Sequence, residues 1–163
     1  MKHIPGVDMS SGSLGQGLSA AVGMALSAKL SHKEYRVYAL LGDGEIQEGQ
    51  IWEAAMFAGA RKLDNLVVIV DNNGLQIDGA IEDVCSPYPI DQKFEAFNFD
   101  VINISAHNFA EIDAAFKMAR QIKDRPTVII AKSIKGRVEG YPLWKIKPHG
   151  MAWRQMMSSM LGL

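Results

Sequence analysis

Apolar residues in the first half of the chain switch between helical spacing and short continuous runs. Residues 14–30 carry them at helical spacing with glycines mainly at the start, which predicts a Gly-rich loop that opens into a buried helix. Residues 37–41 form a continuous apolar run, and residues 49–62 return to helical spacing with strong helix formers. Residues 66–70 are apolar and mostly β-branched, as a central parallel strand should be. The order predicted is therefore helix, strand, helix, strand.

The second half continues this alternation after an interruption. Residues 78–91 contain Gly79, Pro87 and Pro89, which predicts an irregular loop. The elements expected after it are an acidic, aromatic segment over 93–99, a strand over 101–104, an amphipathic helix over 109–122 and a strand over 127–133. Strands that alternate with helices predict an α/β fold, a doubly wound parallel sheet with helices on both faces. We expect one domain over residues 1–163, with a divergent Pro- and Gly-bearing tail over 137–163.

Composition and charge exclude several classes of protein. Seventeen basic and eighteen acidic side chains leave the chain near neutral with no Lys/Arg block, which argues against a nucleic-acid binder. No apolar run is long enough to span a membrane. The single cysteine, Cys85, cannot form an internal disulfide, and the chain does not start with a secretory signal pattern. These features favour a cytoplasmic protein.

Two predicted strands end in polar residues with the chemistry of a metal site. Asp43 follows the first strand, and Asn73 follows the second. Ligands of open parallel sheets bind at the carboxyl ends of the strands, so both side chains should face one crevice. Mg²⁺ prefers hard oxygen ligands, which the Asp43 carboxylate, the Asn73 amide and the Leu75 carbonyl can supply, with a diphosphate and water in the remaining positions. Gly44 leaves room for a phosphate to approach main-chain N–H groups.

The spacing of these residues matters more than either motif alone. A bare Gly-Asp-Gly is also ordinary turn chemistry. Here, however, 27 residues separate Gly44 from Asn72, and they contain a predicted helix and a second apolar strand. A spaced pair of motifs at two strand ends favours a binding site over two unrelated turns.

These motifs resemble the thiamine-diphosphate fingerprint of the transketolase family. The resemblance lies in GDGEIQEGQIWEAAMFAGARKLDNLVVIVDNNGLQIDG and extends from HIPGVDMSSGSLGQGLSAAVGMA to TVIIAKSIKG and His149-Gly150. The family's Gly-Ser/Pro-Leu-Gly-Gln-Gly loop matches residues 12–17. The resemblance implies the following roles: thiamine contacts at Gly12, Ser13 and Leu14; Mg²⁺ ligands at Asp43, Asn73 and the Leu75 carbonyl; diphosphate contacts at Gly44 and Asn73; further cofactor contacts at Lys135 and His149.

The resemblance also implies an activity and partners. Transketolases use thiamine diphosphate and Mg²⁺ to transfer a two-carbon ketol unit from a ketose phosphate to an aldose phosphate, and His149 would be the catalytic residue that reaches the substrate. The family's upstream histidines and its pyrimidine-binding domain have no counterpart here, which implies a domain incomplete at its N-terminus. We therefore expect a subunit or fragment that needs a pyrimidine-domain partner, in a homo- or hetero-oligomer, and that is inactive alone.

Two other functions remain open on the sequence. The chain is alternatively a non-catalytic, truncated cofactor-binding remnant. A thiamine-dependent 2-oxo-acid dehydrogenase component shares the GDG-to-NN spacing, although the GSLGQG loop and the spacing from Lys135 to His149 argue against it. Glu48 and Glu53 follow the GDG motif and face either a subunit interface, as the resemblance implies, or solvent.

Several conspicuous residues have simpler interpretations. We expect His32 and His107 at the surface, the latter beside an Asn108 helix cap. Cys85 has no partner histidine at a recognisable spacing and is interpreted as an inert thiol. The aromatic side chains over 93–99 favour core or interface packing.

Overall fold

A computed structural model describes residues 4–77 and 79–135 of the 163-residue chain. In chain order the elements are α1 (Gln16–Leu30), β1 (Val37–Gly42), the 3₁₀ turn η1 (Glu45–Gln47), α2 (Gly49–Ala60), β2 (Leu66–Asn72), β3 (Leu75–Gln76), β4 (Gly79–Ala80), α3 (Ile81–Cys85), α4 (Ile90–Ala96), β5 (Asp100–Ser105), α5 (Phe109–Gln121) and β6 (Thr127–Lys132). The predicted strands and the three long helices are confirmed, with their boundaries shifted by a few residues.

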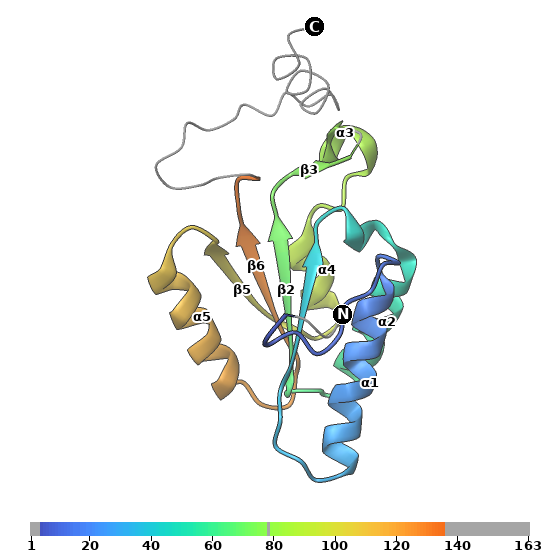
Figure 1. Cartoon of the computed structure of the whole chain (residues 1–163), viewed down its shortest axis with the longest axis vertical. Coiled ribbons are helices and arrows are strands. Elements are labelled where there is room, and N and C mark those ends of the chain that lie inside the picture. Colours follow the sequence, from blue (N-terminus) through green and yellow to red (C-terminus); the bar gives the residue numbers. More distant parts are fainter. Residues whose placement is uncertain (1–3, 78, 136–163) are drawn as a thin grey trace, which may run out of the picture.

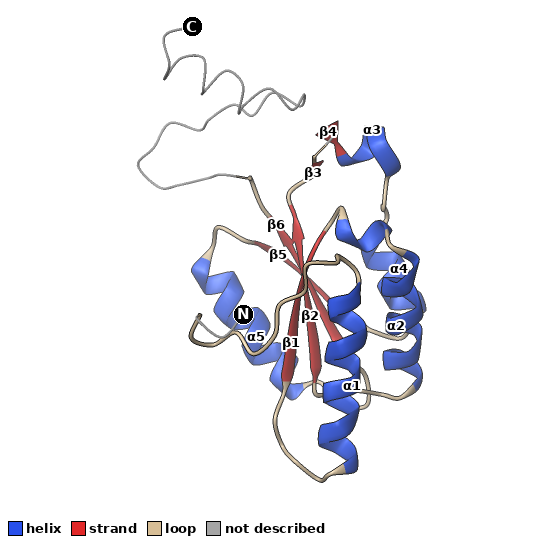
Figure 2. Cartoon of the chain, turned by 45° about the vertical axis from the view of Figure 1, so that its right-hand side comes forward, coloured by secondary structure: helices blue, strands red, loops and turns tan. Residues whose placement is uncertain are grey.

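The centre of the fold is a four-stranded parallel sheet in the order β1-β2-β6-β5. Helices α1, α2 and α4 cover one face, and α5 covers the other (Figures 1 and 2). The α/β fold with a parallel sheet between helices is therefore confirmed. Strand β6, the last of the described strands in sequence order, lies between β2 and β5. Because the strands are parallel, their carboxyl ends all meet at the same edge of the sheet.

The two faces of the sheet have separate apolar cores. Leu66, Val68 and Val70 of β2 point toward α1, α2 and α4, where they pack in the larger core. Val67 points to the opposite face, toward Ala115 and Ala119 of α5, in the smaller core. Strands that bury both faces consist of continuous apolar residues, which explains the uninterrupted runs in the sequence.

The second face of the sheet is incompletely covered. Leu40 of β1 is 73 % exposed and Tyr38 is 45 % exposed, although Tyr38 makes an edge contact with Phe116 of α5 at 5.8 Å between ring centroids. Leu41, one residue on, faces the other core and is 2 % exposed. Edge strand β1 therefore leaves one apolar face open to solvent.

The segment over 78–91 differs from the prediction of an irregular loop. It contains α3, and α4 begins within it at Ile90. Ile81 at the start of α3 is 1 % exposed, and its N–H donates to the Gly74 carbonyl at 2.9 Å. Tertiary contacts thus order a segment whose Gly and Pro content predicts no element.

Candidate functional site

Asp43 lies directly after β1 at the carboxyl edge of the sheet. Its side chain is buried, with 1 % of the residue exposed. One carboxylate oxygen accepts the Gly44 N–H at 2.9 Å, and the other accepts the Gly74 N–H at 2.6 Å. Two backbone amides from different strand ends thus fix the orientation of one carboxylate. The predicted meeting of the two strand ends is confirmed.

The second strand brings another carboxylate to the same place. The Asp43 N–H donates to the Asp71 carbonyl at 3.2 Å, and Ser133, after β6, donates its hydroxyl to the Asp71 side chain. Burial raises the pKa of Asp43 above its ordinary value, and the Asp71 charge adds to the rise, although hydrogen bonds from Gly74 and Gly44 lower it. Burial and the neighbouring Asp71 charge thus make the ionised form of Asp43 less favourable. A cation bound beside the carboxylate would favour the ionised form.

Asn73 and Leu75 form a tight turn beside Asp43. The Leu75 N–H donates to Asn73 Oδ1 at 3.0 Å, and Asn73 Nδ2 donates to Asp71 Oδ2 at 3.3 Å. Gly74 between them has a φ of 72°, a left-handed conformation that favours glycine. The turn flanks Gly74, whose N–H donates to the Asp43 carboxylate, so Asn73 and Leu75 are the chain neighbours of a residue that contacts Asp43.

The side chains at this edge resemble a Mg²⁺ site completed by a ligand. Among residues 4–77 and 79–135, no three His, Cys, Asp or Glu side chains gather as a metal-binding cluster. The predicted donors are instead one carboxylate, one side-chain amide and one main-chain carbonyl. Mg²⁺ uses few protein carboxylates when phosphate oxygens and water complete its coordination, so this donor set fits that mode of binding.

The loop over residues 12–17 lies against the start of α2, beside the metal-site candidates. Gly12, Ser13 and Leu14 are exposed, as residues available to a ligand should be. The Gly15 N–H donates to Glu45 Oε1 at 2.9 Å, and Gln50 Nε2 donates to the Leu14 carbonyl at 3.4 Å. Two segments that the sequence places thirty residues apart therefore meet at one edge of the sheet.

Sequence reasoning missed the polar contacts that connect η1 with β3 and α3. Gln47 Nε2 donates to Gln76 Oε1 at 2.7 Å and to the Cys85 carbonyl at 2.6 Å. A Cβ at Gly44 would approach Gln76 Oε1 to 3.2 Å, so this glycine permits the close packing. The signal available was the segment EIQEG directly after Gly44, in which polar residues flank Ile46 and an α-helix begins only at Gly49.

Tyr88 was also missed. Its hydroxyl donates to Asn72 Oδ1 at 2.7 Å, which ties the segment before α4 to the end of β2. Burial raises the pKa of Tyr88, and the negative charge of Asp43 adds to the rise. Tyr88 thus lies within the electrostatic reach of Asp43.

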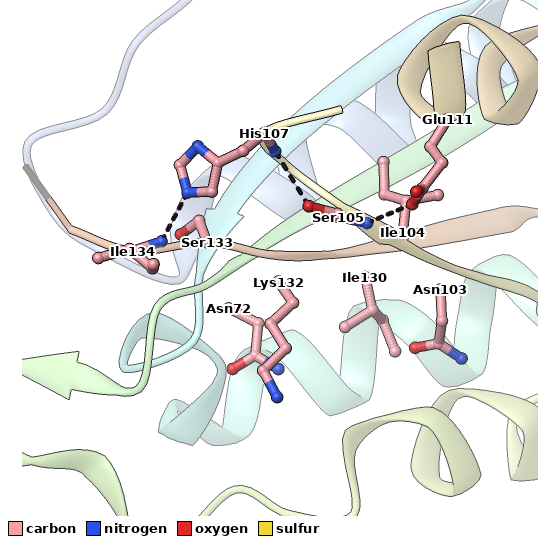
Figure 3. A pocket seen from close by; sticks show the side chains of 10 residues that line it. All are labelled: Asn72, Asn103, Ile104, Ser105, His107, Glu111, Ile130, Lys132, Ser133 and Ile134. Atoms are coloured by element: carbon pink, nitrogen blue, oxygen red, sulfur yellow. Dashed lines mark hydrogen bonds between the residues drawn. The ribbon is translucent and has the colours of Figure 1, made fainter. Parts of the chain in front are cut away.

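A pocket of about 520 Å³ adjoins the carboxyl ends of β5 and β6 (Figure 3). Asn72, Lys132 and Ser133 line it, so it borders the polar cluster of β2. His107 Nε2 accepts the Ile134 N–H at 2.9 Å and holds the chain just before Lys135. His107 is exposed, as predicted, but it is not a free surface residue.

The remaining candidates have mixed outcomes. Lys135 is exposed one residue beyond Ile134, on the strand-end side of the sheet. His149 and the tail over 137–163 lie outside the described residues. Glu48 and Glu53 are both exposed, and their assignment to an interface stays a prediction.

The helix cap and the aromatic packing are confirmed, whereas the interpretation of Cys85 as an inert thiol stays a prediction. Asn108 caps α5, with its Oδ1 accepting the Ala110 N–H at 3.0 Å. Phe94 and Phe99 are buried at 0 % and 3 % exposure, and their rings contact each other with centroids 5.2 Å apart. Cys85 is a free, exposed thiol. Within the described part of the chain, no helix is both long and apolar enough to cross a membrane.

The sequence matches the family described as "Transketolase, thiamine diphosphate binding domain" over residues 1–155. It is 43 % identical over 157 residues to a 6-deoxy-6-sulfo-D-fructose transketolase subunit of Clostridium sp. strain MSTE9, covering 96 % of this chain and 57 % of that protein. It is 39 % identical over 146 residues to an apulose-4-phosphate transketolase subunit of Phocaeicola vulgatus, covering 87 % of this chain and 52 % of that protein. The chain thus spans about half the length of these relatives.

A solved structure supports the same relationship. The transketolase of Campylobacter jejuni superposes with a TM-score of 0.74 and 37 % identity, over 78 % of this chain and 21 % of that one. The sheet and helices described above are therefore those of a transketolase domain. This chain belongs to the transketolase family, in its thiamine-diphosphate-binding domain.

Proposed function

We propose that this chain binds thiamine diphosphate through Mg²⁺ and contributes that site to a transketolase-type transferase. The observation that carries the proposal is Asp43, a buried carboxylate held by two backbone amides at the meeting point of two strand ends. Asp43, Asn73 and the Leu75 carbonyl would hold the metal. Gly44 and Asn73 would contact the diphosphate. The exposed residues Gly12, Ser13 and Leu14 would line the thiamine rings.

The chain's residues have separate tasks in this mechanism. When bound, the cofactor supplies an electron sink for breaking a carbon–carbon bond beside a carbonyl. Asp43 would supply negative charge to the metal, and the N–H groups of Gly44 and Gly74 hold its carboxylate in one orientation. Lys135 would reach the cofactor from the end of β6. His149 would hydrogen-bond substrate oxygens and is the proposed catalytic residue.

The proposed reaction moves a two-carbon ketol unit from a ketose phosphate to an aldose phosphate. The two bacterial relatives are named for a sulfonated deoxyfructose and for apulose 4-phosphate. Both names describe ketoses with an anionic group, which supports a ketose with a terminal phosphate or a similar anion as the substrate class. The glutamate that activates the cofactor would come from a pyrimidine-domain partner, in a homo- or hetero-oligomer.

The need for a partner has a direct test. The purified chain should transfer no ketol unit when it is offered a ketose phosphate and an aldose phosphate with thiamine diphosphate and Mg²⁺. A pyrimidine-domain subunit, where one exists, should restore transfer when it is mixed with the chain. Transfer by the chain alone would contradict the proposed division of the active site between two domains.

The two alternative functions differ from this proposal either in the substrate or in the absence of catalysis. The relatives named above are two transketolase subunits and one transketolase, which supports a ketose over a 2-oxo acid as substrate. A non-catalytic remnant would remain inactive with every pyrimidine-domain subunit. Measuring transfer with the matched subunit therefore separates the enzyme from the remnant.

Calorimetry tests the metal-bridged site itself. We expect thiamine diphosphate to bind the wild-type chain in Mg²⁺, and binding to disappear in EDTA. Asp43→Ala should abolish the heat of binding, because it removes the carboxylate ligand. Asp113→Ala on α5 is the control, since Asp113 is exposed and pairs with Lys117 at 2.6 Å, away from the strand ends. Binding that persists in Asp43→Ala or in EDTA would contradict this mode of attachment.

A further inference from the structure

Glu45 joins two loops of the candidate site through its two carboxylate oxygens. Oε1 accepts the Gly15 N–H at 2.9 Å, and Oε2 accepts the Gly42 N–H at 3.1 Å. Gly15 belongs to the loop over residues 12–17, whereas Gly42 is the last residue of β1, directly before Asp43. A single half-buried side chain therefore spans the gap between the loop and the strand end.

From this geometry we propose that Glu45 is a positioning residue that fixes the thiamine-contacting loop relative to the Mg²⁺–diphosphate end of the site. The inference rests on the proposed function, because it assigns the loop to the rings and Asp43 to the metal. Glu45 itself would touch neither the cofactor nor the metal. It would instead set the distance between the loop that contacts the thiamine rings and the strand end that holds the diphosphate through Mg²⁺.

A purely local capping role does not explain these contacts. Glu45 is the first residue of η1, and its bond to Gly42 is local. The bond to Gly15, however, reaches a residue thirty positions away. Hydrogen bonds that N–H groups donate to a carboxylate are shorter and stronger than those between neutral groups. The long-range bond thus adds a constraint that η1 does not need for its own stability.

The loop over residues 12–17 is closely packed around the Gly15–Glu45 hydrogen bond. Gly15 has a φ of 88°, and a Cβ there would lie 2.8 Å from Gln50 Nε2 and 2.9 Å from the Glu48 Cβ. The loop is therefore pressed against the start of α2, while Leu14 beside it is 61 % exposed. Because Gly15 is buried, loss of the Glu45 carboxylate would leave its N–H as an unsatisfied donor.

The consequence for binding follows from preorganisation. A ligand gripped at both ends gains affinity when the two surfaces are already at the right separation, since no ordering cost remains. Inorganic diphosphate uses only the metal end and gains nothing from the loop. Loss of Glu45 should therefore weaken thiamine diphosphate selectively.

The test compares two ligands on the same chain in Mg²⁺: thiamine diphosphate and inorganic diphosphate. Glu45→Ala removes the hydrogen bonds to both Gly15 and Gly42, and loss of the Gly15 bond should weaken thiamine diphosphate roughly ten-fold. Inorganic diphosphate should stay within about two-fold, because the N–H groups of Gly44 and Gly74 still orient the Asp43 carboxylate. Glu45→Gln keeps one carbonyl acceptor and should fall between Ala and wild type. Glu95→Gln, an exposed residue of α4, is the matched control.

Amide hydrogen exchange tests the tie without any ligand. The Gly15 N–H should exchange roughly ten-fold faster in Glu45→Ala than in wild type, because the carboxylate that accepts it is gone. Glu45→Gln serves if the alanine variant does not fold. Unchanged exchange at Gly15, or equal weakening of both ligands, would overturn the inference. If the wild-type chain binds neither ligand, the proposed function fails, and the exchange measurement alone decides whether Glu45 ties the loops.

Discussion

Aspartates at the two ends of the sheet lie in opposite electrostatic environments. At the amino end, Asp64 pairs with Lys29 at 2.8 Å and accepts the Asp124 N–H at 3.2 Å. At the carboxyl end, Asp43 accepts backbone N–H groups and has a second aspartate, Asp71, beside it. Asp64 thus has an ion-pair partner from the chain itself, whereas the hydrogen-bond donors to the Asp43 carboxylate are backbone N–H groups.

The pKa directions express this difference. Burial raises the pKa of both carboxyl groups, but the Lys29 ammonium and the Asp124 N–H outweigh it at Asp64 and leave that pKa lowered. At Asp43 burial prevails, and the pKa is raised. Ionisation of Asp64 therefore stabilises the folded state, whereas ionisation of Asp43 destabilises it when no cation is bound. A buried carboxylate with a raised pKa is typical of a functional site.

The largest expected effect separates the two aspartates by ligand affinity. Asp43→Asn keeps the side-chain volume but removes the charge of the proposed metal ligand, and should weaken thiamine diphosphate in Mg²⁺ by about 100-fold or more. Asp64→Asn, at the far end, should leave affinity within about two-fold. Calorimetry on both variants measures the ratio. Similar losses in the two variants would show that the ends do not differ in function.

Asp71 should have an intermediate effect. Asp71→Asn removes the negative charge beside Asp43, so Mg²⁺-dependent binding should weaken roughly three- to ten-fold through lost Coulomb attraction. Because the Ser133 hydroxyl and Asn73 amide also contact Asp71, thermal melting of the ligand-free variant is the control. Tighter metal binding in Asp71→Asn would contradict the electrostatic argument.

At the amino end the expected effect is on stability rather than binding. Asp64→Asn should lower the unfolding free energy at pH 7 by about 0.5–1 kcal/mol, the range of a partly exposed ion pair. Since the pKa of Asp64 is lowered on folding, its contribution is complete above 3.8, the ordinary value, and is lost as pH falls through the folded-state value. Urea unfolding from pH 7 downward should show the variant and wild type converging in acid.

The smallest effect is expected at the exposed pair Lys117–Asp113 on α5. Asp113→Asn should change the unfolding free energy by only about 0.2–0.5 kcal/mol, as for other i,i+4 pairs in water. Added salt should remove even this difference, because exposed charges are screened. A larger loss than that of Asp64→Asn would contradict the ranking of ion pairs by burial.

The sequence predicted the sheet well because its strands are continuous apolar runs with polar ends. Residues 37–41 and 66–70 could only be buried strands or short buried helices, and their length and β-branching favour strands. The meeting of Asp43 with the turn at Asn73 followed from parallel topology alone. It needed no knowledge of side-chain packing.

The parts that were missed depend on contacts between distant segments. Glu45, Gln47 and Gln50 are polar residues whose sequence pattern does not say whether they face solvent or another loop. The bond from Gly15 to Glu45 exists only once α1 and η1 are packed together. The helix α3 likewise depends on burial of Ile81, which overrides the turn-forming residues around it.

The strand order has a consequence for how the chain is made on the ribosome. Among the strands that the structure describes, β6 comes last in the sequence but pairs with both β2 and β5. Asn72 therefore pairs with Lys132, which is synthesised sixty residues later. At a synthesis rate of about 5–20 residues per second, β2 exposes an unpaired edge for roughly 3–12 seconds. Ser133, whose hydroxyl donates to the Asp71 side chain, is synthesised directly after Lys132, at the end of this interval. The contact between Asp71 and Ser133 at the strand ends therefore forms late in translation, when β6 pairs at the centre of the sheet.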